Sequence, residues 1–246
     1  MRIVLGLALL CAVALWRMPG TLLDAGLDRA TDGALRLADA SGTVWDGQAV
    51  LMVRDLASNS WQPWLALEWS AEPASLLQGA LSWRISSGGI LAARIAFTAT
   101  QAGIEDAKLQ GPARFFLARI PNSLAHTGWS GDMALHSPAF RCTWKRRCAG
   151  RAELRWTGAA SSLLPGQAFG DYLLTVEGSP NALLLQLRTL RGEVQIRGDG
   201  RWPPGAPPTF NGTIQGDPSF LQRLPSVGGS WLRPSGDAGA WTIAIP

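Results

Sequence analysis

The sequence predicts a mainly β protein, in which an N-terminal transmembrane helix is followed by an elongated, curved antiparallel β-sheet with few short helices. Three observations lead to this fold class. Residues 3–16 carry no charge, most of the remaining chain alternates apolar and polar residues, and the 246 residues include 28 glycines and 16 prolines. Alternation with a period of two is typical of strands with one buried face, and frequent glycine and proline favour turns over long helices.

The uncharged segment 3–16 is the candidate membrane anchor, and it lies between Arg2 and Arg17. A helix of this length reaches about 21 Å, which is shorter than the roughly 30 Å hydrocarbon core of a bilayer. The two flanking arginines can snorkel and so extend the span. We therefore expect residues 1–20 to be a retained anchor whose N-terminus is cytoplasmic.

One other interpretation of this segment remains, a cleaved signal peptide, because Ala12-Val13-Ala14 resembles a cleavage site, although the peptide would be very short. A lipoprotein signal that uses Cys11 is set aside, because Leu10 stands where a small residue is needed. Retention and cleavage both place the rest of the chain outside the cytoplasm.

The chain after the anchor divides into two parts. Residues 21–36 have apolar side chains at helical spacing and are expected to form a linker helix, and residues 37–246 are expected to form a periplasmic β-rich domain. The alternation is clearest at 65–69, 81–85, 151–156, 172–176, 183–187, 194–196 and 241–245. Short helical turns are expected at 73–77 and 218–224, and loops at 202–208 and 228–239.

Glycines recur at the start of the expected strands. We interpret them as residues that supply positive φ where the chain reverses. They are Gly42, Gly79, Gly150, Gly170, Gly192 and Gly212. The segment Asn211-Gly212-Thr213 also matches a glycosylation sequence, but a hairpin turn at Asn211-Gly212 is the better interpretation.

Two cysteines frame the segment CTWKRRC at residues 142–148. The five residues between Cys142 and Cys148 suit neither a CxxC redox motif nor a zinc site. Flanking strands can bring the two cysteines together across a hairpin, so we expect a disulfide, in agreement with an oxidising compartment. Two free thiols are the alternative.

Composition and motifs limit the function. Charged residues make up 16% of the chain, the net charge is +4, and the arginines are scattered among acidic residues. Because no basic stripe with interleaved aromatic residues is visible, we expect no nucleic-acid partner. The basic cluster between Arg141 and Arg151 is interpreted as a solvated hairpin tip rather than a lipid or phosphate contact. The 12 tryptophans are interpreted as core residues in preference to a partner surface.

No catalytic or metal-binding motif is present in the sequence. The two histidines, His126 and His136, have no partner at metal-ligand spacing, and the sequence has no HExxH, GxSxG or GxxxxGK motif. We therefore expect no enzymatic activity, no cofactor and no metal site.

Several short motifs, in this order, resemble the type II secretion system protein N family. The segment SGTVWDGQA at 41–49 is similar to that family's GT-hydrophobic-W-x-G-x-A motif, and GRAELRW at 150–156 precedes a small-residue stretch and Leu164-Pro165. Residues 169–172 and 189–198 are similar to its C-terminal half. The motif residues expected to be structural are Gly42, Thr43, Val44, Trp45, Gly47, Trp156, Gly170, Tyr172, Gly192 and Gly198.

The resemblance implies a single-pass protein of the bacterial inner membrane with its main domain in the periplasm. Such a protein is a non-enzymatic accessory subunit of type II secretion that contacts other inner-membrane and secretin subunits. We expect docking through sheet edges or exposed aromatic patches. The resemblance also implies kinship with AsmA-like proteins, so the alternative function is lipid binding or bridging in an apolar groove.

Overall fold

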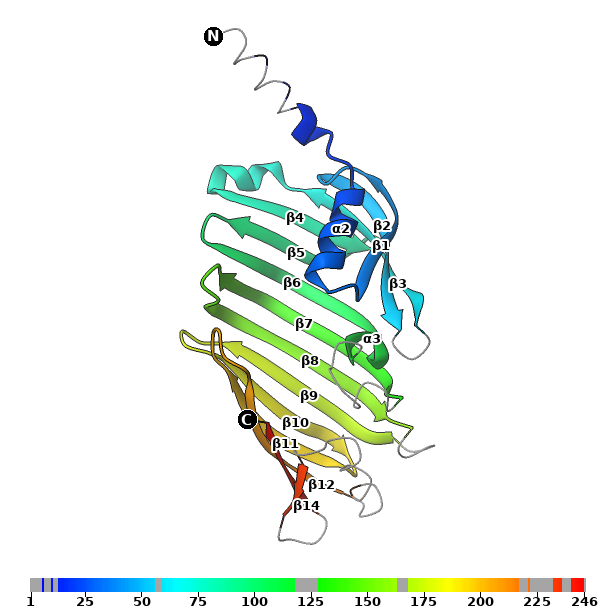
Figure 1. Ribbon diagram of the computed structural model, residues 1–246, viewed down its shortest axis with the longest axis vertical. Helices are drawn as coiled ribbons and strands as arrows, with labels where there is room; N and C mark the ends of the chain where they lie inside the picture. Colours follow the sequence, from blue (N-terminus) through cyan, green and yellow to red (C-terminus); the bar gives the residue numbers. More distant parts are fainter. Residues whose placement is uncertain are drawn as a thin grey trace.

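The computed structural model describes residues 6, 10, 13–55, 59–117, 128–162, 168–216, 221, 232–235 and 240–245. In this part of the chain, fourteen strands form one antiparallel sheet. The strands lie in chain order, except that β13 lies outside β14 at the last edge. Figure 1 shows an elongated, curved sheet, with the N-terminal segment at one end of its long axis and β14 near the other. The predicted β architecture is therefore confirmed.

The sheet is a meander of hairpins with few helical interruptions. Its first seven strands are β1 (Leu35–Gly42), β2 (Asp46–Asp55), β3 (Ser60–Ala71), β4 (Ala80–Ser87), β5 (Ile90–Thr98), β6 (Gln101–Pro112) and β7 (Ser130–Thr143). The others are β8 (Cys148–Ala160), β9 (Ala168–Gly178), β10 (Leu183–Gly192), β11 (Gln195–Trp202), β12 (Thr209–Gln215), β13 (Leu232–Pro234) and β14 (Ala240–Ile245). The described helices are α2 (Thr21–Ala30), the 3-10 helix η1 (Pro73–Gln78) and α3 (Ala113–Leu117). The segments predicted from alternation overlap β3, β4, β8, β9, β10, β11 and β14.

The linker helix is shorter than predicted. Helix α2 ends at Ala30, because Asp32 and Gly33 adopt left-handed φ values of 47° and 73°. The Gly33 N–H then donates to the Asp28 carbonyl oxygen (2.8 Å), which closes the helix end. Strand β1 begins at Leu35, so the sheet starts inside the range predicted to be helical.

Most of the predicted anchor, 3–16, lies outside the described residues. Where the chain is described, no helix is both long enough and apolar enough to cross a membrane. The helical turn predicted at 218–224 also lies outside, apart from Leu221. The loop predicted at 228–239 lies outside except for 232–235, and that part differs from the prediction because β13 pairs with β14 there.

The positive φ predicted for the recurring glycines is confirmed at five of the six, since only Gly212 lacks it, but most of them do not open a strand. Gly79 does precede β4, with φ of 70°. The others end a strand or lie within one: Gly42, Gly150, Gly170, Gly192 and Gly212. Gly170 and Gly192 face each other across β9 and β10, and a Cβ on Gly170 would lie 2.2 Å from the Arg191 carbonyl oxygen. Such glycines let neighbouring strands approach closely. The turn predicted at Asn211-Gly212 is wrong, because both residues lie inside β12.

The two faces of the sheet differ in polarity. Directly paired residues share a face, and one such row crosses five strands through Leu109, Leu135, Leu154, Leu174 and Leu187. All five leucines are half-buried. We call the side of the sheet that carries them the apolar face, and the opposite side, which carries most of the arginines, the polar face.

Parts of the apolar face are covered. Helix α3 packs against β2, β6 and β7, which brings strands from different parts of the sheet to one helix. Nearer the C-terminus a buried cluster has formed, whose members are Ala159, Phe169, Tyr172, Val194, Ile214 and Leu221. We call the five half-buried leucines on β6 to β10 the leucine row.

Candidate functional site

Four aromatic side chains form a continuous row at one margin of the apolar face, and we call them the aromatic row: Trp45, Trp83, Phe97 and Trp144. Trp45 and Trp83 are stacked at 6.0 Å between ring centroids, and Phe97 meets Trp83 edge-on at 6.0 Å. Phe97 and Trp144 are stacked at 6.4 Å. The row therefore joins the β1–β2 turn, β4, β5 and the β7–β8 turn.

Hydrogen bonds hold the indoles of the aromatic row in place. Trp83 donates from Nε1 to the Val44 carbonyl oxygen (2.9 Å), and Trp144 donates to that of Ala99 (2.9 Å). Phe97 is 41% exposed and Trp144 is 58% exposed. Trp45 and Trp83 are half-buried, so the row has one exposed end, formed by Phe97 and Trp144, whose geometry is fixed before any partner arrives.

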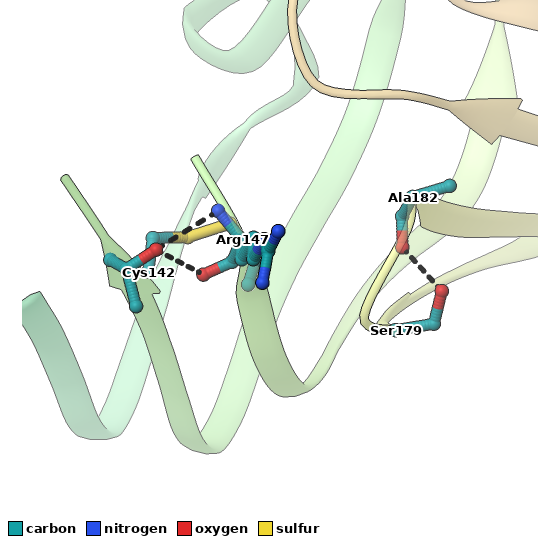
Figure 2. The surroundings of a disulfide bond; sticks show 6 residues. Cys142, Arg147, Ser179 and Ala182 are labelled. Carbon is teal, nitrogen blue, oxygen red and sulfur yellow. Dashed lines mark hydrogen bonds between the residues drawn. A yellow bond between two sulfur atoms is a disulfide. The ribbon is translucent and has the colours of Figure 1, made fainter. Parts of the chain in front are cut away.

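The disulfide lies beside the aromatic row. Cys142 and Cys148 are directly paired across the β7–β8 hairpin and are joined by a disulfide, with 4.0 Å between their Cα atoms. Cys142 pairs with Ala102, which pairs with Phe97, so the disulfide continues the same row of the apolar face. Figure 2 shows the disulfide near the β9–β10 turn, where the Ser179 hydroxyl donates to the Ala182 carbonyl oxygen (2.8 Å).

A second aromatic group lies around α3. Trp64 contacts Phe115 and Phe116, with centroid distances of 5.7 and 5.2 Å. The Trp64 indole N–H donates to the Gln110 carbonyl oxygen (2.9 Å), and Gly111 leaves room for the ring. This group links β3 to the end of β6 and so contributes to the curvature of the sheet.

The first family-like motif forms the β1–β2 turn. The Thr43 hydroxyl accepts the N–H groups of Trp45 and Asp46, each at 3.2 Å. Val44 is buried, and Gly42 pairs with Gly47. A Cβ on Gly47 would lie 2.7 Å from the Trp69 ring, so a side chain there would displace the indole.

The remaining motif residues lie at close approaches in the C-terminal half. The Trp156 indole N–H donates to the Ser130 carbonyl oxygen (3.0 Å), and the Tyr172 hydroxyl donates to that of Val194 (3.0 Å). Burial, with a smaller effect of the Asp171 charge, raises the pKa of the Tyr172 phenol above its ordinary value. Gly198 lies under the Phe210 ring, and Gly170 faces Gly192.

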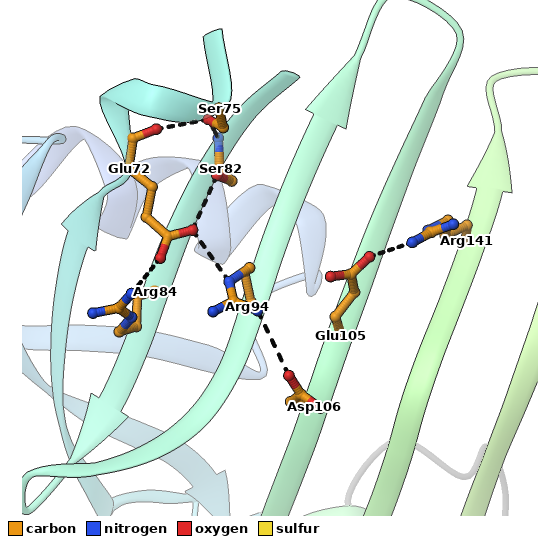
Figure 3. A network of polar contacts seen from close by, with 8 residues as sticks. All are labelled: Glu72, Ser75, Ser82, Arg84, Arg94, Glu105, Asp106 and Arg141. Atoms are coloured by element: carbon orange, nitrogen blue, oxygen red, sulfur yellow. Dashed lines mark hydrogen bonds and ion pairs between the residues drawn. The ribbon is translucent and has the colours of Figure 1, made fainter. Parts of the chain in front are cut away.

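The polar face carries a network of paired charges on β4 to β7, drawn in Figure 3. Glu72 accepts from Arg84 (2.6 Å) and Arg94 (3.1 Å), and Glu105 pairs with Arg141. These residues line an open hollow of about 700 Å³. Because each arginine has an acidic partner, this hollow has little net charge to offer a ligand.

The described part of the chain holds no group of three His, Cys, Asp or Glu residues placed as metal ligands, and no buried side-chain N or O atom there lacks a hydrogen bond. His136 is exposed on β7, whereas His126 lies outside the described residues.

The aromatic row was not predicted as a site. Core filling is correct for Trp69, which is 7% exposed, but not for Trp144 or Trp202, which is 49% exposed. The sequence did contain one indication that Trp144 is exposed. It stands beside Lys145, Arg146 and Arg147, where a solvated hairpin tip was expected. The structure places these three basic residues, all exposed, at that turn.

A family model described as type II secretion system (T2SS), protein N, matches residues 33–226. The matched range begins just before β1 and includes every strand through β12. No curated protein and no solved structure matches the chain in the corresponding comparisons.

Proposed function

Because this chain belongs to the type II secretion system protein N family, we propose that it is a bitopic inner-membrane accessory subunit of the secretion machinery. In this proposal, residues 1–20 anchor it and the β-rich domain acts in the periplasm. It works by binding other subunits and performs no catalysis. Membership of the family supports a place in the cell envelope, and the aromatic row supports the mode of docking.

The aromatic row has the properties of an interface hot spot. Tryptophan is enriched among the residues that dominate binding energy, and anchors that are already rigid lose little entropy on association. Trp144 and Phe97 are exposed, yet their positions are fixed by stacking and by the bond from Trp144 to Ala99. A partner with an apolar side chain or groove would bury these rings.

The sheet edges are less suited to docking than the aromatic row. On β1, the N–H groups of Leu35 and Leu37 are bonded to the side chains of Thr31 (3.1 Å) and Asp24 (2.7 Å), which belong to the linker and α2. At the other edge, β13 has three residues and ends in Pro234. Both features discourage pairing with an added strand.

The docking proposal is tested by pull-down of the full chain with the system's inner-membrane and secretin subunits, combined with a secretion assay. We expect Trp144→Ala to reduce both partner recovery and secretion. Trp202→Ala is the control, because it removes another exposed indole outside the row. Normal secretion after deletion of the whole chain, with no partner recovered, would show that the proposal is wrong.

A second candidate function is lipid binding, and the half-buried leucine row favours it. Its five half-buried leucines form an aliphatic strip that matches an acyl chain in chemistry. Lipid extraction and mass spectrometry of the purified full chain test this function. Bound lipid that is lost on Leu154→Gln and kept on Trp144→Ala would establish lipid binding separately from docking.

A further inference from the structure

The arginines of the polar face differ between the two halves of the sheet. In the first half, Arg84, Arg94 and Arg141 each have an acidic partner (Figure 3). In the second half, several exposed arginines form no ion pair and no side-chain hydrogen bond within the described part of the chain; Arg201 on β11 is one, and four others lie on a single line. These four are Arg155, Arg188, Arg197 and Arg233.

Strand register places these four arginines on one line across the sheet. Arg155 on β8 pairs with Leu173 on β9, which pairs with Arg188 on β10. Arg188 pairs directly with Arg197 on β11. The line continues through two threonines, Thr213 on β12 and Thr242 on β14, and reaches Arg233 on β13. We call this line the arginine row.

The row carries uncompensated charge. Like charges directly opposite each other, as in Arg188 and Arg197, destabilise a strand pair. Two nearby acids are engaged elsewhere, because Glu153 pairs with Arg151 (2.8 Å) and Asp171 with Arg191 (3.1 Å). Asp132 on β7 lies diagonal to Arg155 and forms no ion pair within the described residues. Asp199, two residues along β11 from Arg197, remains as the acidic neighbour on that strand.

The local shape also suits a ligand. A hollow of about 590 Å³ lies over β10 to β12. Its polar lining includes two arginines and one acid, together with three glutamines: Arg188, Arg197, Asp199, Gln186, Gln195 and Gln215. Guanidinium and amide groups can donate several hydrogen bonds to a carboxylate. Leu173, between two arginines of the row, is 4% exposed, as expected if their aliphatic stems lie across it. The positive heads then remain toward solvent.

We propose that the arginine row binds an extended, acidic segment of a partner protein. Six strand spacings separate β8 from β13, a length of about 29 Å, which about nine residues of extended chain would span. The row contains no aromatic side chain on which nucleic-acid bases could stack. It lies toward the end of the sheet away from the N-terminal segment (Figure 1), which favours a protein over the membrane that would hold the anchor. The inference goes beyond the proposed function and needs no contact with the aromatic row.

Fluorescence anisotropy with a labelled peptide of about ten glutamates tests this proposal, using the full chain in a neutral detergent at low ionic strength. We expect the double substitution R188Q/R197Q to weaken binding about tenfold or more. R146Q/R147Q is the matched control, because it removes the same charge from two exposed arginines at the β7–β8 turn, and it should change affinity less than about twofold. R188K/R197K keeps the charge and should retain most of the binding.

Three results would overturn the proposal. The first is absence of peptide binding by the unaltered chain, and the second is equal weakening by the two glutamine variants, which would reflect net charge alone. The third is row-dependent binding to phosphatidylglycerol vesicles without peptide binding, which would identify a membrane contact. Peptide binding that survives Trp144→Ala would separate this surface from the proposed docking site.

Discussion

The indole N–H of Trp45 donates a hydrogen bond of 2.8 Å to the carbonyl oxygen of Leu15, and this bond joins the first hairpin of the sheet to the N-terminal segment. Two backbone bonds strengthen the same junction, from Val44 N–H to the Met18 oxygen (2.9 Å) and from Gly20 N–H to the Gly42 oxygen (3.1 Å). The hairpin built by the first family-like motif therefore holds the chain where it leaves the expected anchor.

We predict that Trp45→Phe loosens this junction. The substitution keeps an aromatic ring against Trp83 but removes the bond to Leu15, which is worth about 0.5–1.5 kcal/mol. Local opening should then increase about threefold to tenfold, measured as faster tryptic cleavage after Arg17. Trp144→Phe removes an equivalent indole bond elsewhere and should leave that rate unchanged. Equal cleavage of all three proteins would contradict the prediction.

Asp24 protects the first edge of the sheet, and we predict that Asp24→Ala exposes it. The Asp24 carboxylate accepts the outward N–H of Leu37, so its loss should cost about 1–2 kcal/mol and leave that N–H free to pair with another chain. Sedimentation velocity should show increased self-association. The control Asp28→Ala, on the same helix, should self-associate no more than the unaltered protein. An Asp24→Ala variant that remains monomeric would argue against edge protection.

Gly170 should tolerate no side chain. Its φ is 153°, and an added Cβ would meet the Arg191 carbonyl oxygen at 2.2 Å, so we predict that Gly170→Ala costs about 3 kcal/mol or more. Gly26 in α2 has open space around it, and Gly26→Ala should stabilise the protein by about 0.5–1 kcal/mol. Urea unfolding followed by tryptophan fluorescence measures both changes. A neutral Gly170→Ala would show that β9 and β10 do not approach so closely.

Local patterns were sufficient to predict most of the strands and the disulfide. The alternation of Leu81, Trp83 and Ile85 predicted β4 because each residue's face depends only on its own strand. Cys142 and Cys148 are separated by one tight hairpin, so their pairing is also local. Gly170 could not be interpreted in this way, because its role depends on its distance from Gly192 on the next strand.

Rows that cross the sheet could not be predicted from the sequence. The arginine row depends on register, and irregularities such as the shift between Thr189 and Arg191 change which residues face each other. Arg155 and Arg188 therefore looked like scattered charges, although the fold places them on one line. The aromatic row has the same origin, since Trp45 and Trp144 come from distant turns.

Tyr172 is the chain's single tyrosine, so its ionisation can be followed directly by the absorbance of tyrosinate. Burial and the Asp171 charge raise its pKa, and we predict that the native phenol stays protonated well above the value of about 10 found in the urea-unfolded chain. A raised pKa in the folded state means that the stability from this group is complete below the unfolded pKa. That contribution is lost as the pH rises from about 10 toward the folded pKa. Tyr172→Phe should lower the free energy of unfolding at neutral pH by about 1 kcal/mol, through loss of the bond to Val194. The same substitution should make the free energy of unfolding fall less steeply at high pH. Coincident titration of native and unfolded protein would refute the burial of this phenol.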